Sequence, residues 1–312
     1  MAHPKITVVG AGNVGATCAL WAAARDLGDV CLVDVVPGLA EGKALDLAQA
    51  APIAGFSHKI TGSADYAATA GSDLAIVTAG LARKPGMSRD DLLARNAEIV
   101  AGAVRQLVKA SPETILIIVS NPVDAMTALA HKVSGLPPRR IVGMAGVLDS
   151  ARMRAFVAME AGVSPKDVQA YVLGGHGDSM VPLVRHSSIG GVPLTERLPK
   201  ATLERIVERT RNGGAEIVAL LKTGSAFYAP AAAAVEMAQA ILRDEGRVLP
   251  CAAYCDSEYG VGGYFVGVPV RLGAGGVLGV LEFDLDAEER AAFDRSVQHV
   301  KGLVKKLDAL NV

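Results

Sequence analysis

Residues 5–15 read KITVVGAGNVG, and this stretch decides the fold. An apolar run rich in β-branched residues, typical of a strand, leads into the pattern G-x-G-x-x-G at Gly10, Gly12 and Gly15. An alanine-rich helical segment follows, and a second apolar run, DVCLVDV, contains Asp34, 19 positions beyond Gly15. In this context the glycines predict the phosphate-binding turn of a βαβ dinucleotide unit.

Each glycine of this turn has an expected role. Gly10 allows the tight turn, Gly12 lets the backbone approach a pyrophosphate, and Gly15 brings the helix close to the strand. Asp34 is expected to accept a hydrogen bond from a ribose hydroxyl and to repel the extra phosphate of NADP, and no arginine follows it. The sequence therefore favours NAD. The alternatives are an ordinary strand-helix turn and a nucleoside-triphosphate loop at GLAEGKA (residues 38–44), which has the wrong glycine spacing and lacks the Ser/Thr.

The first half of the chain alternates apolar, β-branched segments with segments of helical period, which indicates parallel βαβ construction. The strands that we expect there are KITVVGAG, DVCLVDV, DLAIVTAG and TILIIVSNP. After about residue 145 long helical patterns alternate with hairpin-like strands, and a last helix is expected from Asp286, its capping residue, to Leu310. We predict a Rossmann-type doubly wound parallel sheet over residues 1–144 and a second α+β substrate domain over residues 145–312.

Composition narrows the class of partner. The chain has 312 residues, 51% of them hydrophobic, and a formal net charge of −1. Its scattered charges favour neither nucleic acid nor a membrane surface, so small molecules are the expected partners. Four sparse cysteines without C-x-x-C spacing favour a reducing cytoplasm over disulfides or a zinc site. The uncharged stretch from Ile6 to Ala24 resembles a signal peptide or a short membrane span, but the glycine turn interrupts it.

The segment GGHGDSM (residues 174–180) carries the histidine best placed for proton transfer, His176, directly after the expected strand QAYVLGG. A histidine base needs a carboxylate to fix its tautomer, and Asp178 and Asp149 both qualify. Asp149 and Arg152 share one helical face, for which the plainer interpretation is a surface ion pair of little value. The residues alone leave this choice open. A metal site and a serine hydrolase are disfavoured, because the ligand spacings and G-x-S-x-G do not occur.

Two further segments follow expected strands. LARKPGMSRDDL (residues 81–92) places Arg83 and Arg89 on a loop that could close over an anion, although a solvated basic loop is usually the better explanation of such a run of charges. Asn121 in VSNPVD offers a neutral amide at the same crevice, or is simply a turn-forming Asn-Pro whose bond can be cis.

These motifs together resemble one known family, the NAD-dependent malate dehydrogenases of the lactate dehydrogenase-like branch. The similarity covers nearly the whole chain. It is carried in family order by ITVVGAGNVG, EGKALDL, ARKPGMSRDDLL, SNPVD, GVLDSAR, GGHGDSMVPL and GSAFYAPAAA.

The resemblance implies a role for each motif residue. His176 would be the general acid/base and Asp149 its orienting carboxylate. Arg152 would bind the C1 carboxylate, Arg89 would polarise the carbonyl, and Asn121 would contact the substrate. The expected cofactor contacts are Gly10, Gly12, Asn13, Val14, Gly15, Asp34, Asn96, Val119 and Asn121.

Arg83 is expected to decide the substrate. The family's lactate enzymes commonly carry glutamine there, whereas the second carboxylate of malate needs a cation. The competing hypotheses are a lactate or other 2-hydroxy acid dehydrogenase and a non-catalytic NAD-binding sensor. Family members are tetramers or dimers. We expect a homo-oligomer, with the tetramer favoured, that uses an apolar helical surface around Leu45, Leu47 and Ile53.

Overall fold

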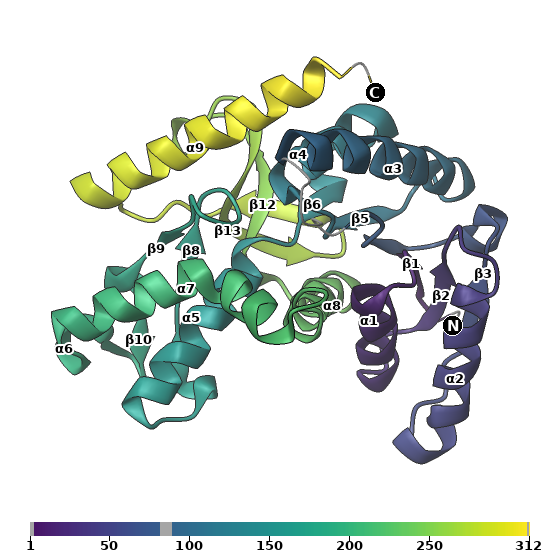
Figure 1. Cartoon of the computed structure of the whole chain (residues 1–312), viewed down its shortest axis with the longest axis horizontal. Coiled ribbons are helices and arrows are strands. Elements are labelled where there is room, and N and C mark those ends of the chain that lie inside the picture. Colours follow the sequence, from purple (N-terminus) through teal and green to yellow (C-terminus); the bar gives the residue numbers. More distant parts are fainter. Residues whose placement is uncertain (1–2, 82–88, 311) are drawn as a thin grey trace.

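A nine-stranded mixed sheet forms the centre of the protein (Figure 1), in the order β14-β13-β12-β6-β5-β4-β1-β2-β3. The computed structural model describes residues 3–81, 89–310 and 312. Six strands are parallel: β1 (Lys5–Val9), β2 (Asp29–Val33), β3 (Ile60–Ser63), β4 (Leu74–Val77), β5 (Ile115–Ile118) and β6 (Ile141–Gly143). Three antiparallel strands extend them: β12 (Arg247–Cys255), β13 (Tyr264–Gly273) and β14 (Gly276–Val280).

Helices cover both faces of the parallel strands, which explains why those strands are nearly continuous in apolar residues. Alternate residues of a strand enter different cores: Val8 and Ile117 pack on one face, and Val9 and Ile118 on the other. The helices of the first half are α1 (Asn13–Ala24), α2 (Leu39–Ala54), α3 (Arg89–Ala110) and α4 (Val123–Ser134).

The second half of the chain builds a smaller layer and also completes the large sheet. Its helices are α5 (Gly146–Ala161), α6 (Leu194–Arg197), α7 (Lys200–Leu221), α8 (Tyr228–Leu242) and α9 (Ala287–Asp308). Its short strands are β7 (Val168–Gln169), β8 (Val172–Leu173), β9 (Val181–Pro182), β10 (Ser188–Ile189) and β11 (Val192–Pro193). A separate apolar core that includes Met153, Val168 and Ile206 joins α5 to α7.

The predicted fold class is confirmed, as a parallel Rossmann core with an α/β C-terminal half. One sheet runs through both halves, since Ala252 of β12 pairs with Gly143 of β6. The division at residues 144 and 145 stays a prediction.

The structure accounts for two features of the sequence, the uncharged stretch near the start of the chain and the expected helix cap near its end. The uncharged stretch at Ile6–Ala24 forms β1, the glycine turn and α1, so it is part of the folded sheet. Among the described residues, no helix combines the length and apolar character needed to cross a membrane. At the other end, the Asp286 side chain accepts hydrogen bonds from the backbone N–H groups of Glu288 and Glu289, as predicted for a helix cap. The helix ends at Asp308 rather than at the predicted Leu310.

Candidate active site

The glycine turn lies at the carboxyl end of β1, where α1 begins (Figure 1). Gly10 has a φ of 97°, a conformation that favours glycine. A side chain at Gly15 would collide with the carbonyl oxygen of Gly10, whereas a Cβ at Gly12 would meet nothing within 4 Å. The turn is therefore tight on the protein side and open at Gly12, as a closely approaching pyrophosphate requires.

The first turn of α1 can receive an anion. The first helical hydrogen bond is donated by Ala16 to the Gly12 oxygen, and no side chain of the described residues caps the helix. The N–H groups of Asn13, Val14 and Gly15 precede this bond, so they have no acceptor within the helix. Together with the positive end of the helix dipole, they suit the phosphates of a dinucleotide.

Asp34 follows β2 and joins the turn to its neighbouring strand. Its Oδ2 accepts a hydrogen bond from the Ala11 N–H at 2.7 Å, and its Oδ1 accepts one from Val36 at 3.0 Å. Each oxygen has a second lone pair with which to accept a hydrogen bond from a ribose hydroxyl. Thr78, the residue after β4, stabilises the turn, because its hydroxyl donates a hydrogen bond to the Gly10 carbonyl oxygen at 3.0 Å.

His176, Asp149 and Arg152 form one hydrogen-bonded cluster. Nδ1 of His176 lies 2.8 Å from Oδ2 of Asp149, and Nη1 of Arg152 donates to Oδ1 of Asp149 at 3.1 Å. The Asp149 side chain is only 2% exposed and that of Arg152 only 13%, so the surface ion pair considered from the sequence is wrong. Because α5 carries both residues beneath the histidine loop, one carboxylate holds both the imidazole and the guanidinium.

The free donors of this cluster suit an anionic substrate. Nε of Arg152 is buried without a hydrogen-bond acceptor in the part of the chain that the structure describes. The same guanidinium lies against two glycines of α7: a Cβ at Gly213 would come within 3.5 Å of Nε, and one at Gly214 within 3.5 Å of Nη2. Nε2 of His176 has no protein partner among the described residues, and 16% of the side chain is accessible. A carboxylate and a hydroxyl could satisfy these groups together.

A second buried acid, Asp124 in the first turn of α4, supports the histidine from behind. Its Oδ2 accepts a hydrogen bond from the His176 backbone N–H at 3.0 Å. From α9, the Ser296 hydroxyl accepts one from the Gly175 N–H at 2.8 Å. The histidine loop is thus fixed by two helices far apart in the sequence. Neither residue was predicted from the sequence, although Asp124 lies within the SNPVD motif.

The charges around His176 favour the protonated form of its imidazole. Burial lowers the pKa of His176, but the charge of Asp149 and its hydrogen bond raise it by more, so the net pKa lies above the ordinary 6.5. Burial raises the pKa of the Asp124 carboxyl to about 6, against the opposing effect of the His176 N–H. A histidine whose pKa is raised by a hydrogen-bonded carboxylate, and whose other ring nitrogen is accessible, is suited to general acid/base chemistry.

Asn121 and Asn96 meet at the carboxyl end of β5. The Asn121-Pro122 peptide bond is cis. The buried Asn96 side chain donates to the Asn121 carbonyl at 2.7 Å and to the Leu81 carbonyl at 3.2 Å, and it accepts from the Leu81 N–H at 2.7 Å. Both of its amide hydrogens are therefore used by the protein, so a cofactor contact of Asn96 would have to use the remaining lone pair of its oxygen.

For Val119, Asn121 and Arg89, the structure gives the position in the fold. Val119, the residue after β5, is buried, and Asn121 is exposed at the same sheet edge. Arg89 was expected on the loop, but it is the first residue of α3. Arg83 lies outside the described residues, and its expected role stays a prediction.

Comparison with known proteins gives the same result over the whole chain. The model of the lactate/malate dehydrogenase NAD-binding domain matches residues 4–143, and that of the alpha/beta C-terminal domain matches residues 146–310. A malate dehydrogenase of Rhodopirellula baltica is 58% identical over 99% of both chains.

Solved structures agree with this result. The malate dehydrogenase of Salinibacter ruber is 52% identical, with a TM-score of 0.95 over 98% of both chains. The lactate dehydrogenase of Cryptosporidium parvum, in complex with lactic acid and β-nicotinamide adenine dinucleotide, is 41% identical, with a TM-score of 0.96 over 99% of both chains.

A dinucleotide turn and a histidine-carboxylate-arginine cluster at one sheet edge define an NAD-dependent dehydrogenase. The matches extend from one end of the chain to the other. The chain belongs to the lactate/malate dehydrogenase family.

Proposed function

We propose that the chain is an NAD-dependent malate dehydrogenase, which oxidises (S)-malate reversibly to oxaloacetate. The observation that carries this proposal is the bonded cluster of His176, Asp149 and Arg152 at the sheet edge that holds the dinucleotide turn. The 58% identity to a malate dehydrogenase supports the substrate assignment.

In malate oxidation, Nε2 of His176 takes the proton from the substrate hydroxyl, and bound NAD accepts the hydride. Nδ1 stays hydrogen-bonded to Asp149, whose negative charge stabilises the imidazolium that forms. In the reverse direction His176 returns the proton. Asp124 fixes the backbone that carries the imidazole.

Arginines hold the substrate in this proposal. Arg152 binds the C1 carboxylate with a bidentate geometry that lysine cannot match. Arg89 polarises the carbonyl and stabilises negative charge that develops on its oxygen. Arg83 pairs with the distal carboxylate, and Asn121 contacts the substrate.

Turnover of two keto acids tests the substrate assignment. We expect the purified protein to oxidise NADH rapidly with oxaloacetate and at least 100-fold less efficiently with pyruvate, by kcat/KM. The likeness to a lactate dehydrogenase makes the second substrate the relevant comparison. A preference for pyruvate would support the lactate enzyme instead, and NADH binding without turnover of either keto acid would support a sensor.

His176→Asn tests the assigned base. We expect NADH affinity to stay within twofold, because the residue lies outside the dinucleotide turn, while kcat falls by about 100-fold or more. A kcat close to that of the parent protein would remove His176 from the mechanism.

The assembly is proposed to be a homo-oligomer, with a tetramer favoured over a dimer, in a reducing cytoplasm. Four apolar side chains on the contacting helices α1 and α2 are exposed: Leu20, Trp21, Leu45 and Ile53. Leu47 differs from the expectation, because it is half-buried against the protein's own core. All four cysteines are free and buried, as suits a reducing compartment.

The oligomer can be tested at the most exposed of these side chains. Ile53, which is 92% exposed, should weaken self-association when replaced by lysine. Light scattering should then give a lower mass for Ile53→Lys than for the parent protein. An unchanged mass would exclude this face as the interface.

A further inference from the structure

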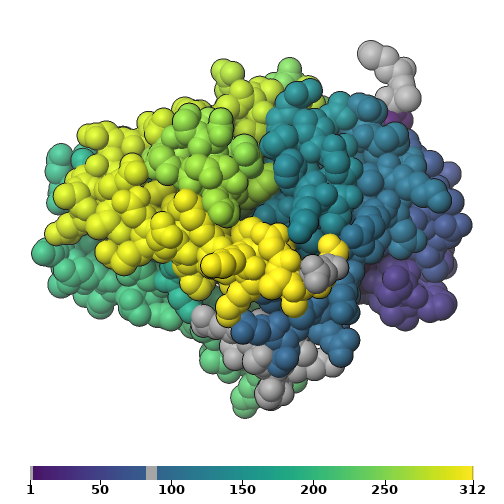
Figure 2. All heavy atoms as spheres, turned by 90° about the horizontal axis from the view of Figure 1, so that it is seen from above, coloured from purple at the N-terminus to yellow at the C-terminus, as the bar shows by residue number. Residues whose placement is uncertain are grey.

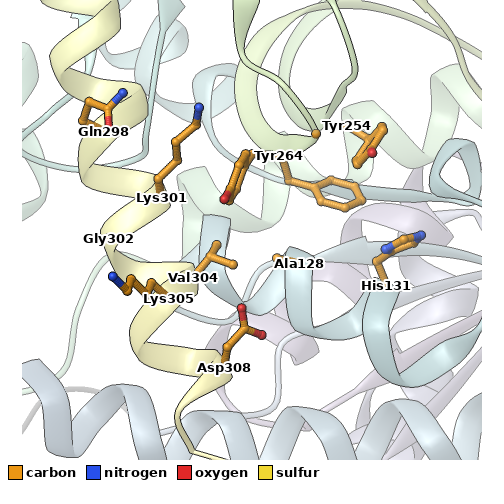
Figure 3. A pocket seen from close by; sticks show the side chains of 12 residues that line it. Ala128, His131, Tyr254, Tyr264, Gln298, Lys301, Gly302, Val304, Lys305 and Asp308 are labelled. Carbon is orange, nitrogen blue, oxygen red and sulfur yellow. The ribbon is translucent and has the colours of Figure 1, made fainter.

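A cavity of about 590 Å³ lies between α4 and α9, over strands β12 and β13 (Figure 3). Six residues define what we call the α4–α9 pocket: Ala128, His131, Tyr254, Tyr264, Lys301 and Lys305. The space-filling view shows α9, in yellow, beside the blue-green segment that contains α4 (Figure 2). None of these residues belongs to the catalytic cluster or to the dinucleotide turn.

One wall of the pocket is cationic. Lys301 and Lys305 are four residues apart on α9, so they occupy neighbouring positions on one helical face. Neither has an acidic partner within the described ranges of the chain. The Asp308 carboxylate, which also lines the pocket, is paired with Lys132 at 3.1 Å. The two ammonium groups therefore leave the pocket with an excess of positive charge.

The floor and the opposite wall are aromatic. Rings of His131 and Phe265 lie 5.5 Å apart by their centroids, and those of Tyr254 and Phe265 lie 5.6 Å apart. Tyr264 lies nearer α9, and the Lys301 ammonium is 4.9 Å from the centre of its ring. Figure 3 shows Tyr264, Tyr254 and His131 on elements that face α9, the helix that carries the two lysines. Aromatic rings beside a lysine are suited to a flat ligand that carries an anion.

Uncommitted polar groups surround the same space. In the parts of the chain that the structure covers, no hydrogen-bond partner exists for the hydroxyls of Tyr254 and Tyr264 or for the amide of Gln298. Small residues keep the walls apart: a Cβ at Gly263 would lie 3.3 Å from the Tyr254 hydroxyl, and one at Gly302 would meet nothing within 4 Å. The cavity can thus offer both donors and acceptors to a bound molecule.

We propose that the α4–α9 pocket is a second ligand site, separate from the active site, and that it binds a nucleoside phosphate. The base rests against the tyrosines and His131, and the phosphate lies between Lys301 and Lys305. Burial lowers the pKa of His131, so its imidazole is neutral at pH 7 and the phosphate depends on the two lysines for charge. An inorganic anion would leave the aromatic wall unused, and an uncharged nucleoside would leave the lysines unpaired.

Calorimetric titration of ADP into NADH-saturated protein tests the proposal, because NADH blocks the dinucleotide site that ADP would otherwise enter. We expect one ADP per chain to bind. Inorganic phosphate and adenosine, each carrying half of the recognised chemistry, should bind at least tenfold more weakly. If ADP does not bind to the NADH-saturated protein, the proposal is wrong. Equal affinity for phosphate and ADP would exclude the nucleoside part of the site.

Variants on α9 separate the pocket from general surface charge. Replacing Lys301 and Lys305 together by methionine keeps their apolar stems and should raise the Kd for ADP by at least about tenfold. The matched control is Lys306→Met, because Lys306 pairs with Asp90 at 2.7 Å and does not line the pocket. Lys306→Met should leave the Kd for ADP within twofold of the parent value, and the affinity for NADH should be unchanged in both variants. Equal ADP binding by the double variant and the control would place the nucleotide elsewhere and overturn the assignment.

Discussion

His176 and Asp149 are 27 positions apart in the chain, yet Nδ1 of the imidazole lies 2.8 Å from Oδ2 of the carboxylate. This bond directs the other ring nitrogen, Nε2, to the accessible side of the cluster. The Asp149 carboxylate also binds Arg152, so the base and the substrate-binding cation share one support. Any change at Asp149 should therefore affect proton transfer and carboxylate binding together.

The raised pKa of His176 gives a pH dependence with a definite sign. Burial opposes the protonated ring, but the charge and hydrogen bond of Asp149 outweigh burial, so the pKa lies above 6.5. Malate oxidation needs the neutral imidazole in the free enzyme. Its kcat/KM should therefore fall as the pH drops through this raised pKa, and the loss should begin above pH 6.5.

Asp149→Asn should shift this acid limb to lower pH, because it removes the charge that stabilises the imidazolium. It should also lower kcat by about 100-fold or more, because an amide can hold the wrong tautomer. Profiles of kcat/KM for malate from pH 5 to 9 measure both effects. Asp167→Asn, an exposed aspartate outside the cluster, is the matched control. An unshifted acid limb would contradict the assignment of Asp149.

Asp124 should make stability depend on pH in the opposite way from an ordinary paired carboxylate. Its pKa is raised to about 6 by burial, so the folded protein binds this proton more tightly than the unfolded chain does. The associated stability is present below the unfolded pKa of about 3.8 and is lost as the pH rises through about 6. Above that range the buried charge destabilises the fold by up to about 3 kcal/mol.

Two substitutions separate this charge from the hydrogen bond to His176. Asp124→Asn keeps an acceptor for the backbone N–H. The free energy of unfolding of this variant, relative to that of the parent protein, should therefore increase as the pH rises from 4 to 7. Asp124→Ala leaves the N–H unpaired and should be less stable than Asp124→Asn by about 1–3 kcal/mol. Denaturant unfolding at several pH values measures both. A pH-independent difference between Asp124→Asn and the parent protein would refute the raised pKa.

The glycines of the dinucleotide turn should separate cofactor binding from folding. Gly12→Ala introduces a Cβ with no protein atom within 4 Å, so the melting temperature should hold while the Kd for NADH rises about tenfold or more. Gly15→Ala collides with the Gly10 carbonyl and should lower the melting temperature markedly. Thermal melts and NADH fluorescence titrations distinguish the two. A stable Gly15→Ala or an unchanged NADH affinity in Gly12→Ala would contradict these roles.

Much of the fold was predictable because the central strands are fully buried. The sequences of β1, β2, β4 and β5 are nearly continuously apolar, and each strand was expected. The edge strand β3 was not, since all four of its residues are half-buried and give no clear pattern. β6 has only three residues. That β12 would extend the sheet was also beyond reach, because strand pairing across more than 100 positions has no local signal.

The site divides in the same way between local and distant signals. The glycine turn and His176 are local motifs and were identified from the residues. The choice of Asp149 over Asp178 came only from the family resemblance, because it depends on how α5 packs beneath the histidine loop. Asp124 and Ser296 act on that loop from 52 and 121 positions away. Contacts of this kind are set by tertiary packing, and spacing along the chain does not reveal them.

Arg83, which lies outside the described residues, gives the sharpest prediction about the substrate. If it meets the distal carboxylate of oxaloacetate, Arg83→Gln leaves that anion without a partner in a closed site, at a cost of about 3–5 kcal/mol. The kcat/KM for oxaloacetate should fall about 100-fold or more, and that for pyruvate should rise. Arg95→Gln, at an exposed position of α3 paired weakly with Glu98, serves as the control. If the ratio of the two kcat/KM values is the same in Arg83→Gln as in the control, another residue selects the dicarboxylate.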